Sequence, residues 1–294
     1  SKQEGSSNVY VRGLGDRYLN TTMNGLSLPS NDVNKKNINL NLFSTDVIEN
    51  VSVAKAYSSK FYGDFSAGNV NISSKDYTGN GFIDFKAGTG FNTNAIGKNF
   101  VRSEGTGFFG YYGRYAHNPF AIILSHGIDP VNAGTPINVS YGGSAGKSFN
   151  FDNGSRLSFF LTGSFNNGYE YRNGNAIDYT LTEKKAFDAA EEFEYSTIST
   201  VMGSANYRIN DENSLKFTSL FINNSSDVVG YFGIDGTGRN RDAILDTDKG
   251  FYQMNVQFDQ TQMTVNQLEG NHKSGKLDVD WGVGYNLVHS KQPD

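Results

Sequence analysis

The chain has 294 residues, a formal net charge of −5 at pH 7, 34 glycines, 14% aromatic residues and no cysteine. The absence of cysteine excludes a disulfide scaffold, a thiolate zinc site and a cysteine nucleophile, and the negative charge argues against nucleic acid as a partner. Many glycines and aromatic residues, with a mean hydropathy of −0.49, indicate numerous β-strands and tight turns rather than a helical enzyme.

The first 78 residues mix short apolar runs with polar, turn-rich stretches, which is typical of a small mixed α/β domain. In LFSTDVIENVSV, Ser44 or Thr45 precedes apolar residues and suits the N-cap of a short helix. We expect a strand near Val51–Ala54 to follow this helix.

From residue 80 onward, apolar and polar residues alternate with a period of two, which predicts strands with one apolar and one polar face. The pattern is clearest in KLDVDWGVGYNLV, where Leu277, Val279 and Trp281 alternate with aspartates and a glycine. Strands are also predicted near 200–209 and 251–260, and less regular ones near 137–149, 156–171 and 214–229.

The connections between these strands alternate in length. Tight turns are predicted at 151–156, 210–214 and 273–276, and long loops at 172–197 and 231–251. Because antiparallel neighbours place every second connection at the same end, short turns gather at one end and long loops at the other. That asymmetry, with an apolar outside and a polar inside, favours an outer-membrane β-barrel.

Two alternatives stay open at this point. A soluble sandwich with one face in water would also show alternating strands, and it would suit a carbohydrate-binding protein. Segment 92–136 could extend the strands by a further pair or form a long first loop.

Several sequence features resemble ligand sites but have simpler interpretations. GTGFFG at 105–110 has the letters of a dinucleotide motif, yet strand-like aromatic sequence follows where a helix is needed. GGSAGKS at 142–148 ends like a P-loop, but Tyr141 stands where that motif needs glycine. No pair of histidines has metal-ligand spacing among His117, His126, His272 and His289.

The segment TEKKAFDAAEEFEYS (182–196) is predicted to form a short amphipathic helix in a loop. Its acidic residues at 191, 192 and 194 could bind a cation, but a solvated charged face is the usual explanation. We therefore expect no metal, no cofactor and no catalytic residue, and the protein is not expected to be an enzyme.

Two segments of the first 78 residues carry a family resemblance. VYVRGLGDRYLNTTMNGLSLP (9–29) resembles the V-R-G-x-x-x-R-Y…N-G-x-x-x-P segment of the plug domain of TonB-dependent outer-membrane receptors. DVIENVSVAKAYSSKFYGDFSAGNVNISSKD (46–76) is similar to that family's I-E-x-[IV]-x-V-x-[KR]…YG-x-x-[AG]-G-x-[IV]-N-[IV]-x-[ST]-K segment. The longer form also resembles the subgroup that carries carboxypeptidase-regulatory-like extensions.

The resemblance implies roles for individual residues. Arg12 takes the place of the family arginine that pairs with glutamates on the inner barrel wall, and Lys55 takes that of a second plug cation in this plug–barrel lock. Lysine lacks the bidentate fork of arginine, so the lock would be looser; ordinary surface charge is the alternative for both residues. The remaining plug-motif positions are Gly13, Arg17, Asn24, Gly25, Tyr62, Gly63 and Gly68.

The implied fold is mainly β: an antiparallel transmembrane β-barrel with a small mixed α/β plug. Residues 1–78 would be the C-terminal part of the plug, and residues 79–294 the N-terminal portion of the barrel. A barrel of about eight strands has room only for side chains, whereas about 22 strands enclose a plug. We therefore expect the chain to be a fragment of a longer protein.

The implied function is plug-gated import of a scarce nutrient across the bacterial outer membrane. The expected partners are the TonB energy-coupling complex and outer-membrane lipids, with room for a surface lipoprotein lid or other envelope subunits. Substrate recognition is expected from the long loops and from the plug loop 27–37. The plug itself is expected to have a polar surface, held by hydrogen bonds and ion pairs that are individually weak in water. The alternative function is a receptor-like barrel that serves as a structural subunit of an outer-membrane assembly or secretion complex.

Overall fold

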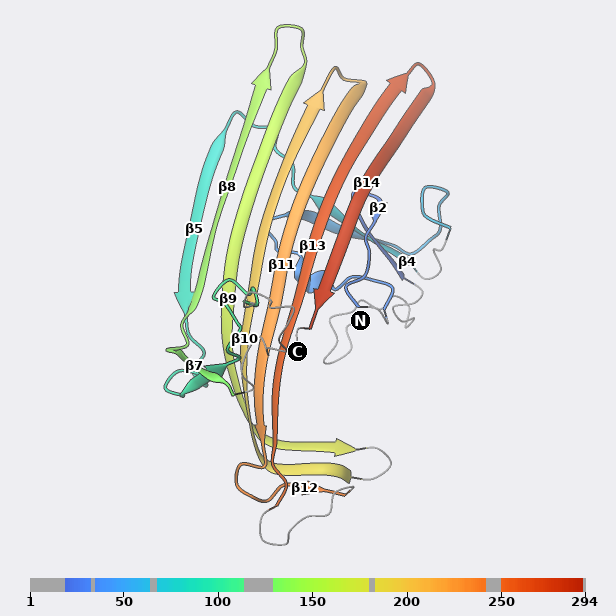
Figure 1. Cartoon of the computed structure of the whole chain (residues 1–294). Coiled ribbons are helices and arrows are strands. Elements are labelled where there is room, and N and C mark those ends of the chain that lie inside the picture. Colours follow the sequence, from blue (N-terminus) through green and yellow to red (C-terminus); the bar gives the residue numbers. More distant parts are fainter. Residues whose placement is uncertain are drawn as a thin grey trace, which may run out of the picture.

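The computed structural model describes residues 19–32, 35–63, 68–113, 129–179, 183–241 and 250–292. Their strands form a four-stranded sheet near the N-terminus, a large antiparallel sheet that takes up most of the chain, and a separate two-stranded sheet (Figure 1). None of the helices in these ranges is long and apolar enough to cross a membrane.

The small sheet has the order β2-β1-β4-β3, in which β1 and β4 run parallel and the other neighbours antiparallel. Its strands are β1 (Leu19–Met23), β2 (Leu26–Ser27), β3 (Ile48–Ala54) and β4 (Gly68–Ser74). Asn24 and Gly25 join β1 to β2 with φ angles of 52° and 81°. Positive φ at both residues is what a two-residue type I′ hairpin requires, and Asn-Gly is its preferred sequence.

The predicted helix after Ser44 is wrong. The described chain has a 3-10 helix, η2 (Leu40–Leu42), which Asn39 caps by accepting a hydrogen bond from the backbone of Asn41. The Ser44 hydroxyl instead accepts from the backbone N–H of Asp46 and donates to its carboxylate, both at 3.1 Å. Such local bonds favour a turn over a helix, and β3 starts directly after it, slightly earlier than expected.

The large sheet confirms the predicted mainly-β, antiparallel fold. Its main strands follow the order β14-β13-β11-β10-β9-β8-β5, and Figure 1 shows them as long, curved neighbours with the small sheet to one side. The strands are β5 (Phe82–Gly90), β8 (Asn138–Asn150), β9 (Arg156–Tyr179), β10 (Glu183–Arg208), β11 (Asn213–Phe232), β13 (Gln253–Ser274) and β14 (Leu277–Lys291), and β12 (Arg239–Asn240) pairs with β10. The tight turns predicted at 151–156, 210–214 and 273–276 join neighbouring strands at one end of this sheet (Figure 1).

The register divides the large sheet into two faces. Residues of β10 such as Met202 face the small sheet, and we call this side the inner face. Their neighbours, such as Val201, lie on the outer face, because side chains alternate along a strand. Toward the tight turns the outer face carries exposed apolar side chains, here called the apolar band: Ile83, Phe85, Phe149, Phe159, Leu161, Val201, Phe217, Leu268, Leu277, Val279, Trp281, Val283, Tyr285 and Leu287.

The predicted loop at 172–197 and its helix at 182–196 are wrong. β9 and β10 continue through this region as a paired hairpin, with Phe193 opposite Tyr171 and Glu194 opposite Glu170. Aromatic cross-strand pairs stabilise strands, and the rings of Phe193 and Tyr171 lie 5.1 Å apart. The segment therefore follows a two-residue period rather than a helical one.

Residues 91–113 and 129–137 form an outer-face loop between β5 and β8 rather than further strands of the large sheet. Within it, β6 (Phe100–Arg102) and β7 (Val131–Gly134) pair with each other. Phe100 is fully buried and meets Tyr169 and Phe193 edge-on at 5.0 and 5.3 Å. Both partners lie on the outer face, beyond the apolar band. The GTGFFG letters fall in a turn of this loop, which is not a strand-to-helix junction.

At Gly110 the outer-face loop approaches the sheet so closely that only glycine fits. Gly110 has a φ of +73°, and a Cβ atom there would overlap the hydroxyls of Thr197 and Ser225. Those two hydroxyls are buried and bonded to each other at 2.8 Å. The turn of the loop therefore sits directly on the sheet, with no room for a side chain.

We expect Gly110→Ala to detach the outer-face loop, because it adds both backbone strain, which costs about 1–3 kcal/mol, and a steric overlap. Limited trypsin digestion should then cut faster at Lys98 and Arg102. Gly134→Ala is the matched control, since Gly134 also has positive φ (+76°) but open space around a Cβ. Equal cleavage of the two variants would contradict the close contact of Gly110 with the sheet.

Candidate functional site

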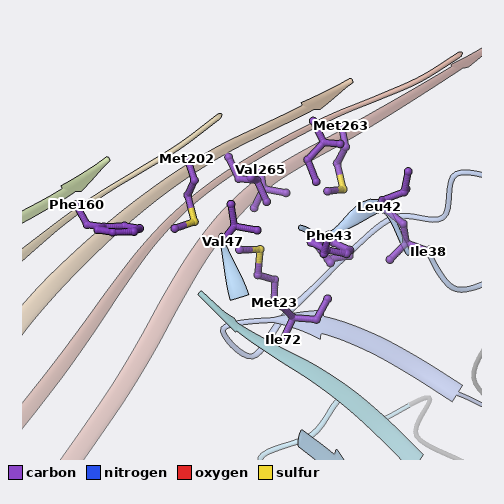
Figure 2. Packing of buried hydrophobic residues seen from close by; sticks show 13 residues of the cluster. Met23, Ile38, Leu42, Phe43, Val47, Ile72, Phe160, Met202, Met263 and Val265 are labelled. Carbon is purple, nitrogen blue, oxygen red and sulfur yellow. The ribbon is translucent and has the colours of Figure 1, made fainter. Parts of the chain in front are cut away.

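The small sheet and the inner face of the large sheet meet in an apolar cluster, in which Figure 2 shows Met23 and Val47 beside Met202 and Val265. Each of its side chains is at most 7% exposed. The small-sheet region contributes Met23, Leu28, Ile38, Leu42, Phe43, Val47 and Ile72, and the large sheet contributes Phe160, Met202, Leu220, Ile222, Met263 and Val265. Full burial of one such side chain stabilises by about 1.5–3 kcal/mol, so this cluster is the main source of adhesion between the two sheets.

This contact differs from the polar surface expected for the N-terminal domain. The reason is visible in β11, where Leu220, Phe221 and Ile222 are consecutive apolar residues. Leu220 and Ile222 point to the inner face and are fully buried, while Phe221 points to the outer face. The irregular alternation of this strand thus marks the part of the large sheet, here called the wall, that the small sheet covers.

A pair of side-chain amides fixes the β1–β2 hairpin to the large sheet. Asn24 Nδ2 donates to Gln267 Oε1, and Gln267 Nε2 donates to the carbonyl of Met23, both at 3.1 Å. The Gln267 side chain is fully buried. We call Asn24 and Gln267 the amide latch. Because buried polar groups are costly when unpaired, the latch defines the position of the hairpin tip as well as holding it.

Asn24 also ties the hairpin to the neighbouring strand β4. Its Oδ1 accepts from the backbone N–H of Ser74 at 2.9 Å, and its own N–H donates to the carbonyl of Ile72 at 2.8 Å. Gly25 donates its N–H to Asn71 Oδ1 at 2.8 Å. The tip is therefore joined to β4 and to the wall at once.

Further polar contacts surround the apolar cluster. Asn286 Nδ2 donates to the carbonyl of Ser27 at 2.8 Å, and Ser290 Oγ donates to that of Asn31 at 2.7 Å. Asn206 Nδ2 donates to Asp76 at 2.7 Å. These bonds come from β14 and β10, so the small sheet is held from several strands of the wall.

A polar cavity of about 510 Å³ lies next to the hairpin tip. Gly25 and Lys60 line it from the small-sheet side, and Lys216, Glu269 and Asp280 from the large sheet. Glu269 Oε2 is buried and has no hydrogen-bond partner among the described residues. The wall thus offers a carboxylate oxygen toward the N-terminal domain.

Five residues of the predicted plug motif lie in the part of the chain that the structure describes. Asn24 and Gly25 come together at the latch. The Tyr62 hydroxyl accepts a bond from the N–H of Ser27 at 3.3 Å, and Gly68 begins β4 opposite Leu19. Gly63 makes no close approach that a Cβ would disturb.

The two predicted lock cations give different outcomes. Lys55 follows β3, is exposed, and forms no ion pair with another residue that the structure describes. Arg12 lies outside the described residues, as do the motif positions Gly13 and Arg17. Sequence reasoning missed Gln267, because a glutamine on the polar face of a strand carries no distinguishing signal.

Glu192 and Glu194 lie beside an arginine on the inner face, far along the strands from the tight turns, whereas Glu191 lies on the outer face and accepts from the Tyr171 hydroxyl. Arg172 Nη1 donates to Glu192 at 2.7 Å, and Nη2 donates to Glu170 and Glu194 at 2.7 and 2.9 Å. Arg172 and Glu170 are more than half exposed, so each pair is weak. In the described ranges no group of three or more acidic, histidine or cysteine side chains could hold a metal ion.

The loop after β11 is shaped by local bonds. Thr237 donates its N–H and its hydroxyl to the carboxylate of Asp235, at 3.1 and 2.8 Å, and these bonds lower the pKa of that carboxyl. Asp235 is exposed and Ile234 is 48% exposed. The part of this connection that follows β11 is therefore a compact turn with exposed side chains.

Comparison with known proteins identifies the N-terminal part. Residues 1–70 match the family model of the TonB-dependent Receptor Plug Domain. The chain carries a TonB-dependent receptor plug. The resemblance to this plug domain is therefore confirmed, and the described part of this region, with its small sheet, is called the plug below.

One solved structure similar to the chain is that of the siderophore receptor PiuA from Acinetobacter baumannii. The match has 10% sequence identity and a TM-score of 0.26, and it covers 96% of this chain and 55% of that receptor. The chain thus spans about half the length of the receptor it matches. No curated protein matches the chain.

We expect Gln267→Ala to loosen the plug by about 1–3 kcal/mol, because Asn24 Nδ2 and the Met23 carbonyl lose their buried partner. Amide hydrogen exchange of residues 19–28 in the purified protein should accelerate by about one order of magnitude or more, since 1.4 kcal/mol corresponds to a factor of ten.

Gln262→Ala is the matched control for this experiment. Gln262 lies on the same strand but on the outer face, where its Oε1 meets Lys291 Nζ at 3.4 Å. Plug exchange should stay unchanged in this variant. Similar acceleration in both variants would show that the latch does not hold the plug.

Proposed function

We propose that the chain is part of an outer-membrane receptor that imports a nutrient through a plug-gated barrel driven by TonB. In this proposal residues 1–78 are the C-terminal part of the plug, and residues 79–294 form the first part of a transmembrane β-barrel in a bacterial outer membrane. The TonB energy-coupling complex and outer-membrane lipids are its partners. The proposed activity is transport without covalent chemistry or a cofactor.

The observation that carries this proposal is the seating of the plug. A domain that matches the plug model lies on the inner face of a long-stranded antiparallel sheet, and the opposite face of that sheet is an exposed apolar band. An apolar outer face is stable in contact with lipid, and the interior of a wide barrel can hold a plug. A soluble sandwich would leave this band in water, where contiguous apolar patches of such size are rare.

The contacts also indicate which strands of the plug would resist a pulling force and which would separate easily. A force applied from the N-terminal side reaches β1 first among the described strands. β1 carries Met23 into the apolar cluster and ends at the amide latch. By contrast, β3 is an edge strand whose Val51 and Val53 are 47% and 44% exposed. We infer that the β1–β2 hairpin sets the resistance to pulling, whereas β3 separates with little loss of buried surface.

Glu269 is our candidate for the wall glutamate of the plug–barrel lock. It faces the plug beside Gly25 and has a buried oxygen with no partner among the described residues. Arg12 and Lys55 are the plug cations that the family resemblance assigns to this lock. Substrate recognition is proposed for the loop at 231–251, the plug loop 27–37 and the inner-face groups around Arg172. A surface lipoprotein lid would be a further partner there.

Deletion of residues 1–78 from the full-length protein tests the gate without knowledge of the substrate. If the plug closes a wide barrel, cells that produce the deleted form should become sensitive to vancomycin, a large hydrophilic antibiotic. Cells that produce the complete form should stay resistant. The sensitivity should persist without TonB, because diffusion through an open barrel needs no energy coupling.

Unchanged resistance after the deletion, with the protein present in the outer membrane, would contradict a plug-gated pore. The alternative role as a structural subunit predicts stoichiometric co-purification with envelope proteins. It also predicts that the double variant Arg12→Ala, Lys55→Ala retains its function.

A further inference from the structure

The outer-face loop presents an aromatic turn at the edge of the apolar band. In residues 107–111, here called the aromatic turn, Phe108, Phe109 and Tyr111 are 45%, 50% and 46% exposed. The whole stretch from Gly105 to Tyr111 contains no charged residue. Three large aromatic side chains thus face outward from a short, uncharged turn.

These side chains are exposed because the turn is held in place. Three successive carbonyls of the turn accept hydrogen bonds from three different strands of the wall. Tyr195 Oη donates to the Phe108 carbonyl at 2.6 Å, Asn223 Nδ2 to that of Phe109 at 3.4 Å, and Gln260 Nε2 to that of Gly110 at 3.2 Å.

A second anchor lies on the same side of the sheet. Asp227 accepts from the N–H and the hydroxyl of Ser103 at 2.9 and 3.0 Å. Asp227, Asn223 and Gln260 are at most 6% exposed. Together with the close approach of Gly110 to the sheet, these bonds leave the backbone of the turn little freedom. The orientation of its rings is therefore a property of the fold.

The aromatic turn borders the apolar band directly. The rings of Phe108 and Phe109 lie 5.4 and 5.1 Å from that of Phe165, which is also 5.1 Å from Tyr141. On the outer face of β9, Leu161 is two alternate positions from Phe165 and is 58% exposed within the band. At roughly 3.3 Å per residue, that separation is about 13 Å along the strand.

The outer face changes character at this level. On the tight-turn side of Phe165 it is apolar and uncovered. On the other side the outer-face loop covers it, both over buried polar groups such as Asp227 and over the rings of Tyr169 and Phe193, which pack against Phe100. The uncovered apolar surface thus ends at the level of the aromatic turn, and aromatic residues gather where a lipid-facing band ends.

We propose that the aromatic turn is a lipid-binding surface that inserts into the interfacial layer of the outer leaflet, where headgroups meet acyl chains. This inference rests on the proposed membrane location of the barrel. Its occupant is lipid because the turn continues the apolar band, lacks charge and points away from the plug. The loop thereby fixes the depth at which the wall lies in the membrane.

The test uses single cysteines in a full-length protein freed of any other cysteine; the 294 residues contain none. Phe109→Cys in the full-length protein is labelled with a nitroxide and reconstituted into nanodiscs of lipopolysaccharide and phospholipid. Collisions of the label with oxygen and with a water-soluble nickel chelate give its depth. Leu161→Cys is the control inside the band, and Asp152→Cys, in a tight turn, is the control in water.

The label at 109 should be severalfold less accessible to the nickel chelate than the label at 152, and shallower in the lipid than the label at 161. Tyr111→Cys repeats the measurement in case the change at 109 disturbs the loop. Water-like accessibility at both turn positions overturns the inference, and so does shielding from both reagents, which would indicate a protein partner or a second copy. If the label at 161 is itself in water, the membrane location fails as well.

Discussion

The uninterrupted register of the central strands is the constraint on which the other features depend. From Ala190 to Arg208, β10 pairs with β11 without a bulge, and β11 pairs with β13 in the same way. Neighbouring residues must therefore point to opposite faces. Ile222 enters the cluster beneath the plug, while Asn223 binds the outer-face loop. One strand thus serves two contacts on opposite sides of the wall.

The different chemistry of these two contacts follows from what they have to hold. The plug is placed by buried apolar surface, which is adhesive but not directional, and the amide latch adds the missing direction. The outer-face loop combines the buried ring of Phe100 with hydrogen bonds to backbone carbonyls, which fix a turn whose three exposed aromatic side chains face outward. In the plug contact, the apolar cluster supplies adhesion and the amide latch supplies orientation. In the loop contact, the hydrogen bonds contribute to both.

Much of the fold could be predicted from local sequence, because alternation and the Asn-Gly dipeptide are local signals. The strand at Leu277–Lys291 was predicted in this way, whereas the hairpin at Asn24 was not predicted, although Asn-Gly is the preferred sequence of its turn. The helix expected at 182–196 failed because contacts across a strand pair decide the structure there, with Arg172 of β9 pairing with Glu192 and Glu194 of β10. The amide latch and the hydrogen bonds that hold the aromatic turn join residues far apart in the chain, so no local pattern marks Gln267 or Asn223.

Trp281 is the single tryptophan of the chain, and its place in the wall has a spectroscopic consequence. Its ring covers Gly270 on the paired strand and stacks on His272 with centroids 6.3 Å apart. The same two strands hold the plug through Gln267 and through Gly284, where Leu26 lies 3.2 Å from the position of a Cβ. Indole emission from Trp281 therefore reports on the pairing of β13 with β14, the two strands that hold the plug on their opposite face.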